Sequence, residues 1–370
     1  MGNTFYSASA DHYCKVYHNQ TYVDQSPLKN CTIPYSLEGD DISWDKCKRY
    51  DVNVSQGVSA GVCSPQSDET VSCDQGWVYD KTWYGSTVVF EYNLVFDNGW
   101  MRQLSKSIVP VGNLVGVIIF GQLSDIFGRR PIFFTTLVLT IVTGVLTSFT
   151  QTYATFVIGQ FLLGALPHPL LVTGNILILE IVSSEYRTMC NAVLHVGFSV
   201  CYMLFGVIAL LCHGNWRLIQ LIAGLSWILF LPSLFFITES PMWLIQKHKY
   251  GKAEKVLQTF AKFNKKTLLP GNILEEDKET QDKSPAVESK VQERQFACSF
   301  VYYGISLNTD QIGNNPYTTF ILAGLVEIPG RLLAWGSLQV IGRRWSLCGF
   351  AFVGGLALIL SVPPGKYRYL

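Results

Sequence analysis

The sequence predicts an all-α protein that crosses a membrane several times, preceded by a polar extracellular domain. Of its 370 residues, 49% are hydrophobic and only 15% are charged. From Ser107 onward, apolar runs close to the ~20 residues that a helix needs to cross a bilayer follow one another in quick succession. The net charge of +1 leaves no basic footprint, so a nucleic-acid partner is not expected.

Residues 1–104 are expected to form an extracellular, glycosylated and disulfide-bonded domain. Three sequons mark glycosylation candidates, at Asn19, Asn30 and Asn53. Five cysteines in this region are disulfide candidates, as expected in an oxidising compartment: Cys14, Cys31, Cys47, Cys63 and Cys73. Five is odd, so one thiol is left over or pairs outside the group. Met1 precedes a polar segment, which predicts neither a signal peptide nor a first membrane helix.

Residues 105–237 are expected to form the first block of membrane helices. The apolar runs predict five spans, near 105–123, 131–149, 154–180, 191–212 and 216–237. Lys and Arg gather at the turns near Arg129 and Arg187 and in the segment after Ile237. The positive-inside rule places those sides in the cytoplasm and the N-terminal domain outside.

Residues 238–294 are expected to form a cytoplasmic helix and linker. Apolar side chains from Trp243 to Ala261 recur at helical spacing, which predicts an amphipathic helix under the bundle. Between Lys247 and Lys266 the only acid among many lysines is Glu254. Two interpretations stay open for these lysines, a solvated surface and attraction to anionic lipid. The polar remainder has the composition of a disordered linker.

Residues 295–370 are expected to form a second, incomplete membrane block. Its first apolar run is too short for a normal span, and longer runs follow near 316–341 and 345–362. Between them lies QVIGRRW, which repeats part of the earlier GQLSDIFGRR at 121–130 without its aspartate. Such a repeat in a second helical block is typical of an internally duplicated transporter.

The GQLSDIFGRR stretch predicts a tight charged turn between two membrane helices. Gly121 and Gly128 allow the helix ends to approach closely, and Asp125 offers a carboxylate to a neighbouring helix end. Arg129 and Arg130 hold the turn in the cytoplasm. By charge alone, a plain positive-inside hairpin explains it equally well.

The spacing of this turn resembles the signature loop between helices 2 and 3 of the major facilitator superfamily. The ordered set GQLSDIFGRR, LEIVSSEYRT, TESPMWL and LVEIPGRLLAWGSLQVIGRR resembles the organic cation, organic anion and carnitine transporters, over about residues 40–360. The resemblance implies a partial bundle, about helices 2–6, part of 7, 8 and 9. It implies a gating motif of Gly121, Asp125, Gly128, Arg129, Arg130, Glu180, Arg187, Glu239, Arg343 and Arg344.

The chain departs from this pattern mainly in length. The resemblance implies twelve helices, whereas this sequence lacks helix 1, the first part of helix 7 and helices 10–12, so we expect a truncated product, fragment or alternative isoform. In relatives the loop aspartate latches against helix 11, so Asp125 is expected to lack its partner. Gln160 and Met242 stand where an arginine is common, which puts borrowed charge relays in doubt.

Ionisable side chains inside the predicted spans are candidates for substrate binding, because burying them in a bilayer is costly. Glu327 and Arg331 are four residues apart with the acid first, which favours an intrahelical pair. The resemblance to organic-anion members implies instead that Arg331 faces a central cavity. His168 lies between two prolines and either bonds freed carbonyls or contacts substrate. His195, alone on an apolar helix, is expected to be a core histidine.

Tyr302 and Tyr303 complete the candidate substrate site. The resemblance matches them to the aromatic part of helix 7, and a ring face attracts organic cations. As interfacial or packing tyrosines they need no such role.

The sequence predicts a plasma-membrane, multi-pass transporter of small organic ions, either cations, anions or zwitterions such as carnitine, working by alternating access. Its expected partners are the substrate and the lipid bilayer. No cofactor or metal is expected, and without a nucleophile–base pair or phosphate loop we predict no enzyme. The alternative is a truncated chain that transports nothing and associates with the full-length protein to regulate it. A receptor on a helical anchor is disfavoured, because the motif loops belong to transporters.

Overall fold

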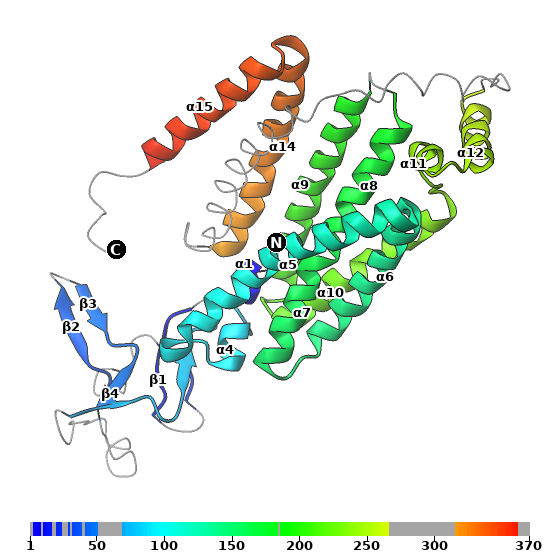
Figure 1. Cartoon of the computed structure of the whole chain (residues 1–370). Helices are drawn as coiled ribbons and strands as arrows, with labels where there is room; N and C mark the ends of the chain where they lie inside the picture. Colours follow the sequence, from blue (N-terminus) through cyan, green and yellow to red (C-terminus); the bar gives the residue numbers. More distant parts are fainter. Residues whose placement is uncertain are drawn as a thin grey trace.

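A bundle of long helices dominates the molecule (Figure 1). The computed structural model describes residues 3–8, 10–16, 20–23, 29, 32–38, 41–50, 69–183, 186–265 and 315–361. The first block consists of α5 (Gly99–Phe127), α6 (Arg129–Ser148), α7 (Tyr153–Ala165), α8 (Pro167–Ile181), α9 (Arg187–Leu211), α10 (Trp216–Ser226) and the 3₁₀ helix η3 (Trp227–Phe235). The second block consists of α14 (Pro316–Val340) and α15 (Arg343–Ser361).

Six segments in the described part of the chain are long and apolar enough to cross a membrane. Five are in the first block, as predicted, and α14 is the sixth. Large apolar side chains such as Leu229 and Phe235 are 80% and 84% exposed, which suits a surface that faces lipid tails. The prediction of a multi-pass helical membrane protein is confirmed.

Two predicted spans are not single α-helices. The span expected at 154–180 is divided at Leu166, which ends α7 and precedes α8. Pro167 is the first residue of α8, where its missing N–H costs nothing. The last span of the block tightens into η3, which contains Pro232. Proline cannot donate to the carbonyl four residues earlier, so it interrupts the α-helical ladder.

Small residues let the helices approach closely. Gly112 and Gly116 of α5 lie against the backbone of α7 around Ala165, where an added Cβ would clash. Gly144 of α6 faces Gly224 of α10 in the same way. Membrane helices associate through such small-residue contacts, because the apolar tails give them no hydrophobic driving force.

The two blocks meet where α9 packs along α14 (Figure 1). The rings of Tyr202 and Phe320 stack with centroids 3.9 Å apart. Gly206 and Gly324 provide the room for this approach, since a Cβ on either would touch side chains of the other helix.

The N-terminal region forms short antiparallel strand pairs at one end of the bundle. The pairs are β1 (His12–Cys14) with β6 (Trp77–Tyr79), β2 (Tyr35–Glu38) with β3 (Asp41–Trp44), and β4 (Lys48–Tyr50) with β5 (Thr70–Ser72). A disulfide joins Cys14 to Cys73, which confirms that the region is disulfide-bonded. Cys47, another candidate, carries a free thiol, and Cys31 and Cys63 lie outside the described residues.

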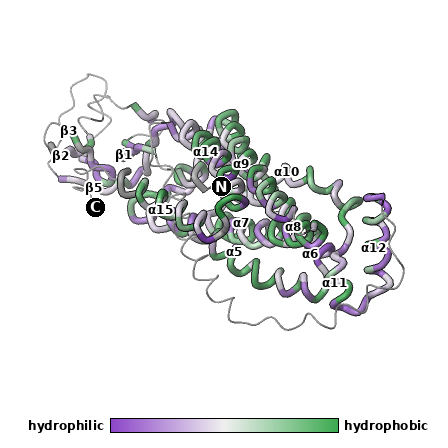
Figure 2. The backbone as a smooth tube through the Cα atoms, turned by 90° about the horizontal axis from the view of Figure 1, so that it is seen from above, coloured by the Kyte–Doolittle hydropathy of each residue, from purple (hydrophilic) through white to green (hydrophobic). Residues whose placement is uncertain are grey.

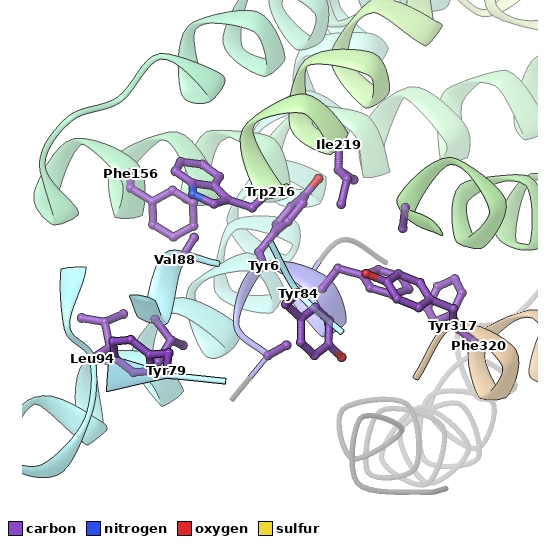
Figure 3. Close-up of a cluster of buried hydrophobic side chains, with 14 of the residues drawn as sticks. Tyr6, Tyr79, Tyr84, Val88, Leu94, Phe156, Trp216, Ile219, Tyr317 and Phe320 are labelled. Atoms are coloured by element: carbon purple, nitrogen blue, oxygen red, sulfur yellow. The ribbon is translucent and has the colours of Figure 1, made fainter. Parts of the chain in front are cut away.

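An aromatic cluster ties this region to the bundle (Figure 3). It draws on α1 (Asn3–Tyr6), β6, α4 (Val88–Tyr92), Val95 just before η2 (Phe96–Asn98), and the nearby ends of the long helices. Phe5, Trp216 and Phe320 in it are fully buried. Tyr84 and Tyr317 also belong to it, so it joins the N-terminal region to both blocks.

The predicted amphipathic segment forms two helices at the opposite end of the bundle, α11 (Pro241–Gln246) and α12 (Tyr250–Phe263) (Figure 1). The single helix that we expected is broken at His248, whose φ of 56° is left-handed and cannot continue a helix. Trp243, Leu244 and Ala253 are buried between the two helices. Figure 2 shows α12 as largely hydrophilic.

Candidate functional site

A charge network surrounds the turn between α5 and α6. The Arg129 guanidinium lies 3.0 Å from a carboxylate oxygen of Glu180, in the last turn of α8. Their side chains are only 13% and 20% exposed. Ser240, which caps α11, donates to Glu180 and also accepts from Arg129 at 3.4 Å. The network therefore joins the ends of three helices.

Glu239 caps the start of α6. Its carboxylate accepts the backbone N–H groups of Arg129, at 3.0 Å, and Arg130, at 3.2 Å. The N-terminus of a helix offers unpaired N–H groups and the positive end of its dipole, and both favour a carboxylate. Gly128, at φ 111°, is needed here because a Cβ would lie 2.5 Å from the Glu239 carboxylate.

The remaining residues of the predicted gating motif take different places. Asp125 is 73% exposed and lies 3.9 Å from Arg129, so it has a loose contact where we expected no partner. Arg130 donates to the Leu234 carbonyl, and Arg187 donates to the Val182 carbonyl and closes the turn before α9. Gly121 has open space beside it, so the close approach expected there is wrong.

The repeated loop near 342–344 is more open. Gly342 adopts φ 87° between α14 and α15, and the Arg344 side chain is exposed. The side chain of Arg343, the other predicted member, lies outside the described part of the structure.

The sequence analysis missed two residues that take part in the contacts around the α5–α6 turn. Trp243 donates its indole N–H to the Asp125 carbonyl at 3.0 Å, which ties α11 to the end of α5. Ser240 was missed as a network member, although serine before Pro241 is a standard signal for the start of a helix. Neither long-range contact has a local sequence signature.

The predicted substrate residues on α14 form the intrahelical pair. Arg331 donates to Glu327 at 2.6 Å, and their side chains remain 35% and 22% exposed. His195, which we had interpreted as a core histidine, lies on α9, the helix that packs along α14. His195 is only half-buried. The three side chains therefore lie where the two helical blocks meet.

The other substrate candidates are less defined. His168 lies in the first turn of α8 and is exposed. Tyr302 and Tyr303, like the glycosylation candidates Asn19, Asn30 and Asn53, lie outside the described residues. Within the described part of the chain, no group of three His, Cys, Asp or Glu side chains could hold a metal ion.

A second set of contacts holds the opposite end of the bundle, and the sequence did not predict it. Arg217 of α10 pairs with Glu91 of α4 and donates to the Ser148 carbonyl at 2.8 Å. The indole of Trp216 donates to the same Glu91 carboxylate at 2.9 Å. Tyr317, at the start of α14, donates to the Trp83 carbonyl at 2.7 Å. These bonds link the N-terminal region to both blocks.

The chain is similar to several known proteins. Residues 97–368 match the family described as "Sugar (and other) transporter". The chain is 32% identical to the organic cation transporter protein of Drosophila melanogaster, over 98% of this chain and 69% of that protein. It is 31% identical to human solute carrier family 22 member 2, over 100% of this chain and 71% of that protein.

The match covers part of the relatives' length. Among the relatives compared, the chain spans 61% to 71% of their length. The xylose transporter of E. coli, in a partially occluded inward-open conformation, aligns with a TM-score of 0.49 and 18% identity, covering 69% of this chain and 68% of that one.

Proposed function

The chain belongs to the sugar (and other) transporter family of the major facilitator superfamily, among the organic cation transporters and solute carrier family 22. From that premise we propose that it carries the machinery to move small organic ions across the plasma membrane by alternating access. In such a mechanism two helical blocks rock around a site near the middle of the bilayer.

The observation that carries this proposal is the Glu327–Arg331 pair on α14, with His195 on the neighbouring helix α9. All three side chains lie on membrane helices, and charges in a bilayer are retained where they serve a substrate or ion path. They lie on α9 and α14, the helices through which the two blocks meet. A site at such a junction changes shape when the blocks move.

We further propose that Arg331 favours anionic or zwitterionic substrates. The pair is neutral overall, so an incoming carboxylate can compete with Glu327 for the guanidinium. A cation would have to displace Arg331 from Glu327 instead. The bidentate geometry of arginine suits a carboxylate, which a lysine reproduces only as a point charge.

Uptake measurements test the transport proposal. Cells expressing this chain, or the chain completed with the missing helices of a relative, are given radiolabelled carnitine, p-aminohippurate or a cationic dye. Arg331→Ala should reduce uptake of the first two at least about tenfold, which corresponds to ~1.4 kcal/mol, and leave the dye nearly unchanged. Arg331→Lys is the matched control and should lose less. Equal losses for all three compounds would remove Arg331 from the substrate site.

As an alternative function, we propose that the chain does not transport but associates with a full-length homologue and regulates it. The chain spans 61% to 71% of the length of the relatives compared. Co-expression with that homologue distinguishes the two. The alternative expects no uptake by this chain alone and a changed uptake by the homologue, with both proteins recovered in one complex.

A further inference from the structure

The exposed lysines around α12 form a basic surface at the end of the bundle that carries Arg129 and Arg130. Its members are Lys247, Lys249, Lys252, Lys255, Lys262 and Lys265. All are exposed, and Glu254 is the only acid between the first and the last. We propose that this lysine surface binds anionic lipid headgroups, of the phosphatidylserine class, in the cytoplasmic leaflet.

The apolar side of α12 is already occupied by protein. Ala253 and Ala261 are buried, two turns apart on one side of the helix. Ala253 packs with Trp243 and Leu244 of α11. Lys252, Lys255 and Lys262 are spaced three and seven residues apart, so they share another side of the helix. That side projects charge away from the protein.

The helix is also held close to the bilayer. The last membrane segment of the first block ends at Phe235, whose side chain is 84% exposed and so marks a level that faces lipid. Only residues 236–240 separate this segment from α11. Trp243 then fixes α11 to the end of α5 through the Asp125 carbonyl. Phe263, beside the last lysines, is 88% exposed. A basic helix with an exposed aromatic residue is typical of the membrane interface.

Charge complementarity identifies the partner. The cytoplasmic leaflet is negatively charged, and each lysine near its surface strengthens binding about fivefold. Lysine is a compact point charge suited to phosphate groups. Within the described part of the chain, none of the ion pairs involves these lysines. Lys249 lies over the Trp243 ring, 4.8 Å from its centroid, and the other five are available for headgroups.

Hydrogen exchange in nanodiscs tests the proposal. The whole chain is placed in neutral phosphatidylcholine discs and in discs with increasing phosphatidylserine, and exchange of the α12 amides is followed. Phosphatidylserine should slow this exchange, and the effect should weaken as salt rises, because exposed charges are screened over ~8 Å at physiological ionic strength.

Two variants and a phosphate control decide the result. Lys252→Gln, Lys255→Gln and Lys262→Gln together should reduce the phosphatidylserine effect at least about tenfold, while keeping helix propensity nearly unchanged. Lys48→Gln with Lys81→Gln, on exposed lysines of the extracellular region, is the matched control and should keep the full effect. Inorganic phosphate at equal charge should not reproduce it.

Other outcomes overturn the proposal. If phosphatidylserine leaves exchange unchanged, the lysines form a solvated surface. If an effect appears only after Glu275→Gln, Glu276→Gln and Asp277→Asn, the chain's own acids occupy them. If the triple lysine variant keeps the full effect, the lipid acts elsewhere on the protein. None of these outcomes depends on whether the chain transports.

Discussion

The two ends of the helical bundle are held together by different forces. At the end beside the N-terminal strands, which we call the strand end, large side chains such as Trp216, Tyr317 and Phe320 are buried together, supported by the Glu91–Arg217 pair. At the end that carries the α5–α6 turn, which we call the turn end, carboxylates of Glu180 and Glu239 bind a guanidinium and the N–H groups of a helix terminus. Hydrophobic burial does not depend on the direction of the contacts, whereas charge-assisted hydrogen bonds require particular distances and angles.

This difference has a mechanical consequence. At the strand end, directional bonds such as Glu91–Arg217 are added to a large buried apolar area. At the turn end, the bonds converge on the ends of α6, α8 and α11, so moving any of these helix ends breaks several bonds together. The turn end is therefore better suited to two discrete arrangements, as packed and bonded interfaces generally are.

The largest effect should come from the disulfide, which acts only at the strand end. Replacing Cys14 and Cys73 by serine opens a loop of sequence separation 59, which the chain-entropy model values at about 4 kcal/mol. Limited proteolysis and thermal unfolding should both show an unstable N-terminal region. Cys47→Ser, at a free thiol, is the control and should leave both unchanged. Equal loss in the control would contradict the expectation.

The second-largest loss of stability should come from the charge network at the turn end. Glu180→Gln leaves the Arg129 charge largely buried without its ionised partner, which should cost about 3 kcal/mol in thermal unfolding. Glu254→Gln, on the exposed surface of α12, should cost almost nothing. If the ends are independent, the losses from Glu180→Gln and from the disulfide variant should add within about 0.5 kcal/mol. A clear departure from additivity would mean that the two ends are coupled.

A smaller loss of stability is expected from the hydrogen bond that ties α14 to the N-terminal region. Tyr317→Phe keeps the buried ring but removes the hydrogen bond to the Trp83 carbonyl, at a cost of about 1 kcal/mol. Hydrogen exchange should quicken around residues 83–86. The exposed Tyr186→Phe is the control and should change nothing. No change in exchange at 83–86 would show that ring burial alone holds this contact.

The smallest effect concerns the pH dependence of stability at the strand end. Burial lowers the pKa of His12 on β1, despite its hydrogen bond to the Ala10 carbonyl. The unfolded chain then binds more protons, so stability should fall as the pH drops below about 6.5, and His12→Gln should remove this step. The Arg49 guanidinium holds the pKa of Asp74 below its usual range, so its contribution is lost only at lower pH. Unfolding midpoints between pH 7.5 and 5.5 measure the His12 step, and a midpoint that rises on acidification would contradict it.

Local physics made much of the fold predictable. The apolar runs gave the spans, because a bilayer leaves a helix no other way to satisfy its backbone. The spacing of Glu327 and Arg331 predicted their pair, because residues four apart share a helix face. A proline lies next to the break at Leu166 and another lies within η3. The sequence does not show whether a proline kinks a helix or divides it.

The contacts that distinguish the two ends were not predictable in this way. Glu239 lies 110 residues from Arg129, and Arg217 lies 126 residues from Glu91, so no local pattern pairs them. The sequence by itself determined that the chain is a multi-pass helical protein of a transporter family, because hydropathy and short motifs are local properties. Only the tertiary structure decided which charges meet, because that depends on how close small residues let the helices pack.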